Sequence, residues 1–230
     1  MTAQREVIDR VWSDLISATS RRDGPGALQA ARPAQEIGLL RASADAVLLG
    51  LAQDSPGAQR AASQLAEALN QRGWVGDLAL AGLLTSTAAQ PTGRDPLTVD
   101  LDGLADVLSD GVGGWLDLET GFAWPQEIMD GDGPGDIPGP DEEPDRWLEV
   151  GFTGSGDPWQ DMADFVSTVS DSQAGQDLQR AIEGKGAFKR FQTTMDRHPE
   201  LCAPWRVHSH ERRLGRARQW LTDNSYDSIP

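Results

Sequence analysis

The sequence contains little cysteine, no long apolar run and, in its middle third, almost no positive charge. Its single cysteine, Cys202, cannot form an internal disulfide, which is typical of a reducing compartment. No apolar run approaches the roughly 18–20 residues that cross a bilayer. Residues 1–10 lack the basic start and apolar stretch of a secretory signal. Together these absences predict a cytoplasmic protein that makes no membrane contact.

The negative charge is concentrated in one part of the chain. The 230 residues carry a net charge of -16, and residues 97–174 contain 19 acidic residues against one basic residue, Arg146. Residues 175–230 contain 10 basic and 7 acidic residues. A protein with this excess is repelled by nucleic-acid phosphates and by anionic membranes. We therefore expect no nucleic-acid partner, unless the basic C-terminal helices offset the repulsion locally.

Apolar residues recur at helical spacing through residues 3–86, and turn signals separate the helical segments. One of these signals is the Asp-Gly-Pro-Gly stretch at 23–26, which we interpret as a turn between helices. The pattern predicts an N-terminal helical domain over residues 1–90. A small, polar stretch with prolines follows it and predicts a linker at 91–96.

The period changes from helical to alternating after residue 114. Residues 115–118 and 122–124, joined by a turn that contains Gly121, predict a β-hairpin. Residues 146–150 predict a third strand. Between them, residues 130–145 are acidic and rich in glycine and proline, so we expect a disordered or irregular acidic loop.

Helical spacing returns after residue 156 and continues to residue 221. We predict that residues 97–225 form an α+β domain. The expected fold class is α+β and mostly helical. It combines an N-terminal helical bundle with a small antiparallel β-sheet that packs against several C-terminal helices.

Several motifs in this second part resemble the uncharacterised bacterial protein family numbered 0158. They are the stretches Leu116 to Gly121, Trp147 to Val150, Asp161 to Phe165, Glu183 to Phe191, His198 to Leu201, Trp205 and Ala217 to Leu221. The resemblance covers about residues 97–222. It implies a shared fold. It does not indicate a particular activity, because no activity is assigned to the family. The sequence departs from the family pattern in its acidic stretch at 130–145 and at Pro204.

Two glycine-containing stretches are candidates for ion or phosphate binding. Asp130, Asp132, Gly135 and Asp141 match positions of a calcium loop, but Pro134 occupies a ligand position and no helical pattern flanks the stretch. We interpret it as a solvated loop. Gly184-Lys185-Gly186 lacks the strand that precedes a phosphate loop, so we interpret it as a turn between helices.

Other polar residues also fail to form a recognisable reactive set. His198, Cys202, His208 and His210 are close in sequence, but they do not have the spacing of four zinc ligands. Asp157, Asp161 and Asp164 are expected on a solvated helix face, and Ser155 is expected in a loop. The sequence therefore predicts no catalytic residue, no cofactor and no metal site.

The stretch from Gly184 to Arg197 is the most distinctive one. As a helix, it places Phe188, Phe191 and Met195 on one side, which we expect to be buried. A basic stripe is expected to meet an acidic surface, either the protein's own middle third or a separate protein. The predicted partner-binding residues are Lys189, Arg190, Arg197, Arg212 and Arg213.

These features favour a non-catalytic module for protein interaction or regulation. An enzyme with a cleft between the sheet and the helices is the first alternative, although no recognisable nucleophile or ligand set supports it. Association with RNA or DNA through the basic C-terminal helices is the second alternative, and the net charge opposes it.

Overall fold

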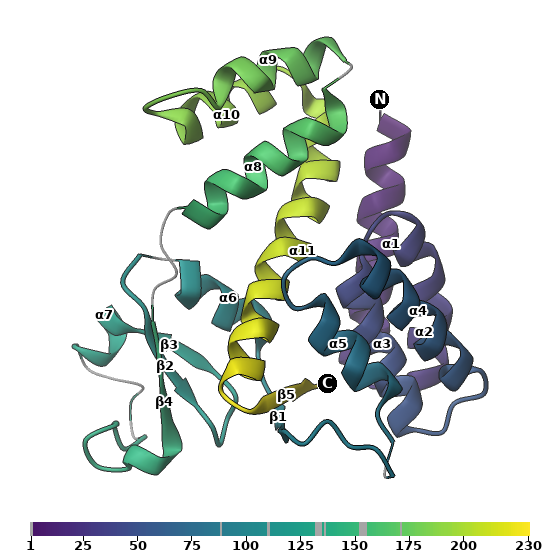
Figure 1. The fold of residues 1–230 in the computed structure, drawn as a ribbon, viewed down its shortest axis with the longest axis vertical. Helices are drawn as coiled ribbons and strands as arrows, with labels where there is room; N and C mark the ends of the chain where they lie inside the picture. The colour runs from purple at the N-terminus through teal and green to yellow at the C-terminus, as the bar shows by residue number, and fades with distance from the viewer. Residues whose placement is uncertain are drawn as a thin grey trace.

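The computed structural model describes most of the chain, namely residues 2–87, 89–109, 111–131, 135, 137–151, 156–170 and 172–230. The described part is α+β and mostly helical, as predicted (Figure 1). Asp132 and Pro134 of the calcium-loop pattern, and Ser155, lie outside the described residues.

The N-terminal part is a helical bundle that surrounds a leucine- and alanine-rich core. Its helices are α1 (Thr2–Ser20), α2 (Gly24–Glu36), α3 (Leu40–Ala52), α4 (Ala58–Arg72) and α5 (Asp77–Thr85). Helix α2 differs from the prediction, because the stretch at 23–26 starts a helix as well as making a turn. The carboxylate of Asp23 accepts a hydrogen bond from the Gly26 N–H at 3.0 Å, and Pro25 lies in the first helical turn.

The predicted three-stranded antiparallel sheet is confirmed. Its strands are β2 (Gly114–Asp117), β3 (Ala123–Pro125) and β4 (Trp147–Val150), in the order β3-β2-β4. Trp115 pairs with Trp124 across the hairpin, and Leu116 pairs with Leu148 on the other side. Helix α6 (Leu101–Ser109) packs the buried Leu104 and Leu108 in the same core as Leu116.

A second, parallel pair of strands was not predicted. Strand β1 (Asp95–Thr98) pairs with β5 (Tyr226–Ile229), and the two segments are far apart in the sequence. Asp95 lies opposite Tyr226, and an ion pair of 2.7 Å between Arg94 and Asp227 lies beside the pair. The pair joins the start of the α+β part to the end of the described chain.

The acidic stretch at 130–145 forms irregular structure where it is described. It follows the single turn of α7 (Gln126–Met129) and ends in the 3-10 turn η1 (Pro144–Arg146). The indole N–H of Trp147 donates a hydrogen bond of 2.9 Å to the carbonyl of Pro138. The stretch is therefore held to the sheet at one point within residues 137–145.

In the described ranges, four helices lie between β4 and β5, namely α8 (Gly156–Val169), α9 (Gln173–Ala181), α10 (Ala187–Met195) and α11 (Pro199–Asp223). Gly184 and Gly186 have φ values of 69° and 79° in the turn between α9 and α10. These left-handed conformations favour glycine, which confirms the interpretation of this motif as a turn.

The prediction for one aromatic residue of α10 is wrong. Phe191 and Met195 are buried, and the Phe191 ring lies 4.9 Å from the Trp205 ring of α11. Phe188, in contrast, is 48% exposed. The buried face of α10 consists of Ala187, Phe191, Thr194 and Met195, and Phe188 lies at the edge of this face.

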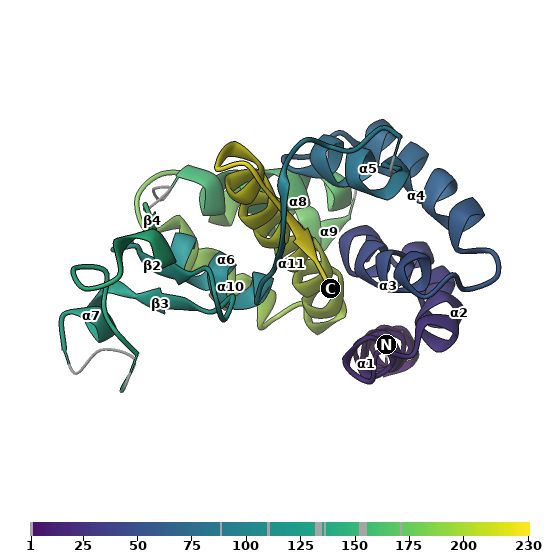
Figure 2. The ribbon, with the colours of Figure 1, turned by 90° about the horizontal axis from the view of Figure 1, so that it is seen from below.

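Helix α11 runs through the middle of the molecule. Figures 1 and 2 show α6 on one side of α11 and the N-terminal bundle on the other. Ala203 and Val207 of α11 belong to the core of the bundle, while Ala217 and Leu221 belong to the core beneath the sheet. Trp205 packs against the third core, which α8, α9 and α10 form. The division into domains at 1–90 and 97–225 stays a prediction, and α11 contacts both parts.

Candidate functional site

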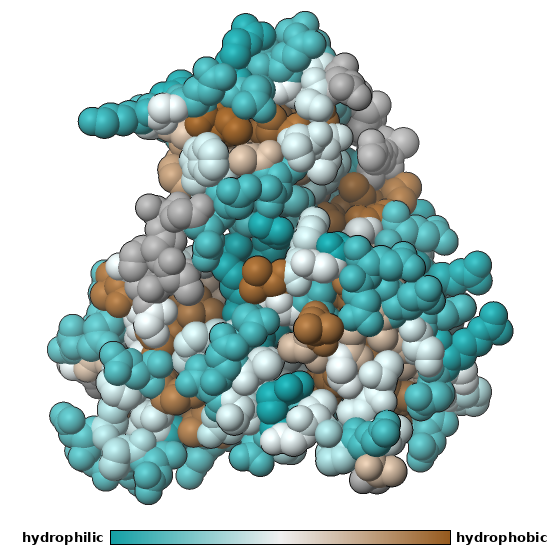
Figure 3. Space-filling model, in the orientation of Figure 1, coloured by the Kyte–Doolittle hydropathy of each residue, from teal (hydrophilic) through white to brown (hydrophobic). Residues whose placement is uncertain are grey.

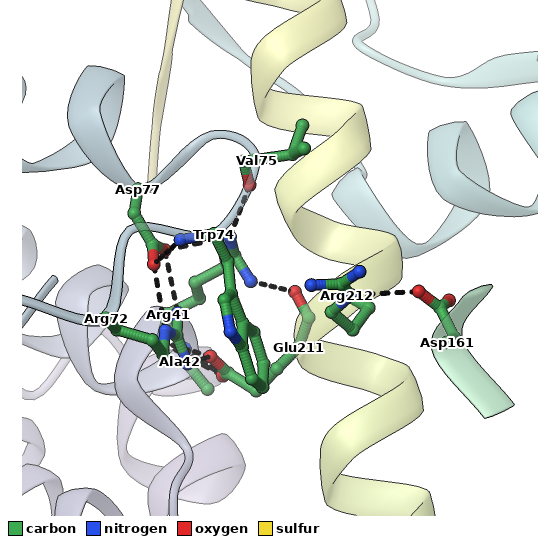
Figure 4. A network of polar contacts seen from close by, with 9 residues as sticks. All are labelled: Arg41, Ala42, Arg72, Trp74, Val75, Asp77, Asp161, Glu211 and Arg212. Atoms are coloured by element: carbon green, nitrogen blue, oxygen red, sulfur yellow. Dashed lines mark hydrogen bonds and ion pairs between the residues drawn. The ribbon is translucent and has the colours of Figure 1, made fainter. Parts of the chain in front are cut away.

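Four charged side chains from distant parts of the chain meet where α11 packs on the bundle (Figure 4). We call Arg41, Arg72, Asp77 and Glu211 the interface network. Arg41 lies 2.8 Å from Asp77, and Arg72 lies 2.7 Å from Asp77 and 2.8 Å from Glu211. Arg41, Asp77 and Glu211 are fully buried, so two positive charges neutralise two negative charges inside the protein.

The carboxylate of Glu211 also caps helix α3. It accepts hydrogen bonds of 3.0 Å from the backbone N–H of Arg41 and of 3.4 Å from that of Ala42, near the start of the helix. The N-cap residue itself is Leu39, whose side chain cannot accept a hydrogen bond. A residue of α11 therefore satisfies a helix start that the local sequence leaves open.

The geometry of the interface network indicates a structural role. Burial lowers the pKa of Arg41 to about 10 even though Glu211 and Asp77 raise it, so the side chain remains positively charged at neutral pH. Removing one partner of such a buried set is costly, because the remaining charge stays buried without compensation. The guanidinium groups of Arg72 and Arg212 also lie over the Trp74 ring, at 4.4 and 5.1 Å from its centroid.

Two glycines allow the backbones to approach closely beside the interface network. A Cβ atom on Gly215 of α11 would collide with the Arg41 guanidinium and the Val75 carbonyl oxygen. A Cβ atom on Gly76 would collide with the Gly215 carbonyl oxygen, and Gly76 has a φ of 82°. The contact between α11 and the start of α5 therefore requires glycine on both sides.

Two of the predicted partner-binding residues form ion pairs within the protein. Arg212 lies 2.9 Å from Asp161 and 2.7 Å from Asp164, and Arg213 pairs with Asp106. The acidic residues belong to the middle third of the chain. The prediction that Asp161 lies on a solvated face is wrong, because it is 3% exposed and also binds Arg216 at 2.8 Å.

The other three predicted residues line one concave surface on the α9–α10 hairpin, with a volume of about 540 Å³. We call this surface the basic groove. Its lining consists of Asp177, Arg180, Ala181, Gly186, Lys189, Arg190, Thr193, Thr194 and Arg197. Four cations thus surround one carboxylate in a protein whose net charge is -16.

The cations of the basic groove differ in the number of hydrogen bonds and ion pairs that they form within the protein. Arg190 donates to the carbonyls of Ala181, Glu183 and Lys185, so it holds the end of α9 and the turn after it. Arg197 donates 3.0 Å to the hydroxyl of Thr194. Within the described ranges, neither Lys189 nor Arg197 has an ion-pair partner.

Asp177 is the one negative charge of the basic groove. A hydrogen bond from His198, at 3.1 Å, lowers the pKa of Asp177, as does the nearby charge of Arg180. Asp177 is therefore ionised at neutral pH, and Arg180 lies 2.6 Å from it. One cation is neutralised in this way, and the basic groove keeps a positive excess.

The histidines and the cysteine that were considered as metal ligands have separate surroundings. His208 is packed between the rings of Trp74 and Phe165, at 5.1 and 5.6 Å, while His210 contacts Trp12 at 4.8 Å. Cys202 donates weakly to the carbonyl of Met195. In the part of the chain that the structure describes, no three such residues gather where they could hold a metal ion.

Sequence reasoning missed two groups of residues. Arg180 and Asp177 complete the basic groove, and their position one helical turn apart on α9 could have placed them beside the basic stripe. Arg41 and Glu211 were also missed. A single arginine at the start of the apolar run 37–51 is the signal that could have indicated a buried ion pair.

Comparison with known proteins confirms the resemblance seen in the sequence. The model of the Uncharacterised protein family (UPF0158) matches residues 94–229, more than half of the chain, which therefore belongs to this family. One relative is the UPF0158 protein PA5073 of Pseudomonas aeruginosa. It is 30% identical over 136 residues, which cover 56% of this chain and 84% of the relative. No solved structure matches the chain.

Residues 1–93, which contribute the bundle and three of the four residues of the interface network, lie outside the family match. None of the described helices combines the length and the apolar character that a membrane span requires.

Proposed function

We propose that this protein is a non-catalytic interaction module that binds an acidic segment of another protein in the basic groove. The observation that carries the proposal is the gathering of Arg180, Lys189, Arg190 and Arg197 around one carboxylate. The single cysteine, which forms no disulfide, fits a reducing compartment, so the proposal includes a cytoplasmic location.

The charge distribution favours an acidic partner and directs it to one place. Cations on a concave surface attract an acidic segment and accelerate its encounter. The 19 acidic residues of 97–174 repel the same segment from much of the remaining surface. Repulsion elsewhere adds to specificity, because a wrong orientation then costs free energy.

The lining of the basic groove favours a peptide over a nucleic acid. Proteins that bind single-stranded nucleic acids usually stack the bases on aromatic side chains. The lining contains threonine, alanine and glycine beside the charged residues, and no aromatic residue. Carboxylates, in contrast, need only the donors that lysine and arginine supply.

A fluorescent decaglutamate peptide tests the proposal by fluorescence anisotropy. We expect binding that weakens with added salt, and a loss of roughly tenfold or more when Lys189→Glu and Arg197→Glu are combined. Combining Arg10→Glu with Arg60→Glu is the matched control, because it also reverses two positive charges, at exposed arginines of α1 and α4 outside the groove. Equal loss in the control, or tighter binding of oligothymidine than of the peptide, would contradict the proposal.

The lysine content allows a second test of the binding position. Lys185 and Lys189 are the only lysines of the chain, and both lie near the turn between α9 and α10. A carbodiimide joins peptide carboxylates to amines that are in contact with them. We expect mass spectrometry to find the decaglutamate peptide attached to Lys189. Attachment at the N-terminal amine alone would place the peptide elsewhere.

A further inference from the structure

A second cavity, of about 650 Å³, has the opposite charge character to the basic groove, because acidic residues line it. Helix α1 and the start of α3 form one wall of the cavity, and the start of α6, the middle of α11 and the end of β5 form the other. Figures 1 and 2 show α11 beside α1 and α3 of the bundle, with α6 on the other side of α11. The volume lies in the range that small-molecule sites occupy, and junctions between parts of a protein are preferred places for such sites.

The walls of this cavity combine an apolar surface with acceptors. Trp12 and Leu214 lie on facing walls, and the His210 ring packs against Trp12. Three carboxylates, those of Asp45, Asp100 and Asp102, also line it. Neither lysine nor arginine is among its lining residues.

Only one of the three carboxylates is neutralised within the described part of the protein. Asp45 pairs with Arg218, which lies behind the wall. Asp100 accepts a hydrogen bond of 3.1 Å from the Gly103 N–H, and Asp102 lies 3.4 Å from His210 Nδ1. Burial lowers the pKa of His210 although Asp102 and Glu211 raise it, so the ring is neutral at neutral pH. Two negative charges therefore remain at the edge of an apolar, partly aromatic cavity.

We propose that this cavity binds a small organic cation, a protonated amine or guanidinium on an apolar body. The apolar body would lie against Trp12 and Leu214, and the cationic group would lie between Asp100 and Asp102. The two carboxylates attract the cationic group through direct charge, while Trp12, whose ring centroid already lies 5.1 Å from the Arg206 guanidinium, provides apolar contact for the body. This ligand site is additional to the proposed interaction function, and the two proposals are tested independently.

Because the cavity lies between the bundle and the α+β part, ligand binding affects how strongly these two parts associate. Trp12 belongs to the bundle, which lies outside the family match, whereas Asp100, Asp102 and His210 belong to the family part. A ligand that contacts both walls binds only the docked state of the two parts. Ligand binding therefore stabilises their association by mass action.

The test uses two probes with the same phenylethyl body, 2-phenylethylamine with a cationic end group and 2-phenylethanol with a neutral one, on the full chain. We expect the amine to raise the melting temperature in a concentration-dependent way and to show saturable binding by calorimetry, while the alcohol has little effect. Combining Asp100→Asn with Asp102→Asn should weaken amine binding roughly tenfold. Asparagine still caps a helix, so this variant keeps the start of α6.

Combining Asp141→Asn with Glu142→Gln (the Asp141 variant) is the matched control, because it also removes two negative charges, from exposed residues outside the cavity. Equal binding of amine and alcohol, or equal weakening in the Asp141 variant, would overturn the proposal. Agmatine and a capped arginine peptide then distinguish the source of the cation. Binding of the peptide without binding of agmatine or of the amine would also overturn it, since the ligand would then be a protein segment.

Discussion

The interface network and the basic groove use the same kind of residue under opposite conditions. Arg41 is fully buried and contacts Asp77, Glu211 and two backbone carbonyls. Lys189 is exposed and, in the ranges that the structure describes, lacks an ion-pair partner. Both side chains are cationic, but Arg41 lies in the apolar run 37–51, whereas Lys189 lies between Lys185 and Arg190 in a basic stretch.

The difference between the two regions lies in what happens to the water around each charge. Moving a charge out of water costs several kcal/mol, so the buried arginines are stable only with complete pairing. An exposed cation keeps its water and contributes roughly 0–1 kcal/mol to stability. Charges of the interface network therefore hold the fold together, while charges of the basic groove remain available to a partner.

The largest expected effect comes from breaking the interface network. Glu211→Ala leaves Asp77 as the one carboxylate of the interface network facing both Arg41 and Arg72, and it removes the cap of α3, so we expect a loss of about 3–5 kcal/mol in the free energy of unfolding. Urea denaturation measures it. Glu200→Ala is the control on the same helix, because Glu200 is exposed and pairs only with His198 among the described residues. A similar small loss in both variants would show that the network is solvated.

A smaller effect is expected at the close contact of α11 with the bundle. Gly215→Ala places a methyl group against the Arg41 guanidinium and the Val75 carbonyl, and overpacking of this kind costs about 1–3 kcal/mol. Gly82→Ala is the control, because no atom lies within 4 Å of the added methyl group in α5. Alanine there should stabilise the helix by about 0.5–1 kcal/mol. Thermal melts of the two variants should shift in opposite directions.

The next effect distinguishes two cations within the basic groove. Arg190→Ala removes the donors to the carbonyls of Ala181, Glu183 and Lys185, so we expect a loss of about 1 kcal/mol. Lys189→Ala should change stability by less than about 0.5 kcal/mol, because the side chain is exposed. Parallel urea titrations compare them. Equal stability of the two variants would mean that Arg190 is also free to bind a partner.

The smallest expected effect is a change in pH dependence beside the interface network. Burial lowers the pKa of His208 below its usual 6.5, although Asp161 raises it. The unfolded chain therefore takes up a proton first as the pH falls through about 6.5, and stability decreases below that pH. His208→Phe keeps a ring between Trp74 and Phe165 and removes the titration. Melting temperatures between neutral pH and mildly acidic pH should fall less steeply in the variant than in the parent protein.

Local patterns in the sequence predicted much of the fold. Alternation of apolar residues around Gly121 predicted the hairpin, and the three-stranded sheet has the expected strands. The parallel β1–β5 pair was missed because its two strands are short and lie at distant points of the sequence. Pro96 also weakens the strand signal, since proline cannot donate to a ladder. Long-range pairing of this kind leaves no periodic trace in either segment.

The site was predictable only in part, for a related physical reason. Helical spacing predicted that Lys189, Arg190 and Arg197 lie close together, although α10 ends at Met195 and Arg197 lies in the turn after it. Which arginines are exposed depends on carboxylates that approach from other elements, as Asp161 does for Arg212. The start of α3 shows the same limit, because its cap is supplied by Glu211, 170 residues away from Arg41. Helical periodicity describes one element at a time, whereas burial depends on its neighbours.

The central position of α11 has a consequence for how the chain is made. The helix supplies residues to the core of the bundle and to the core beneath the sheet, and it packs on the third core. Synthesis proceeds from the N-terminus, so every other helix of the described chain leaves the ribosome before α11. The growing chain therefore carries three unfinished apolar surfaces until α11 emerges. Such surfaces are what chaperones bind, and we expect the nascent chain to be a better chaperone substrate than the released protein.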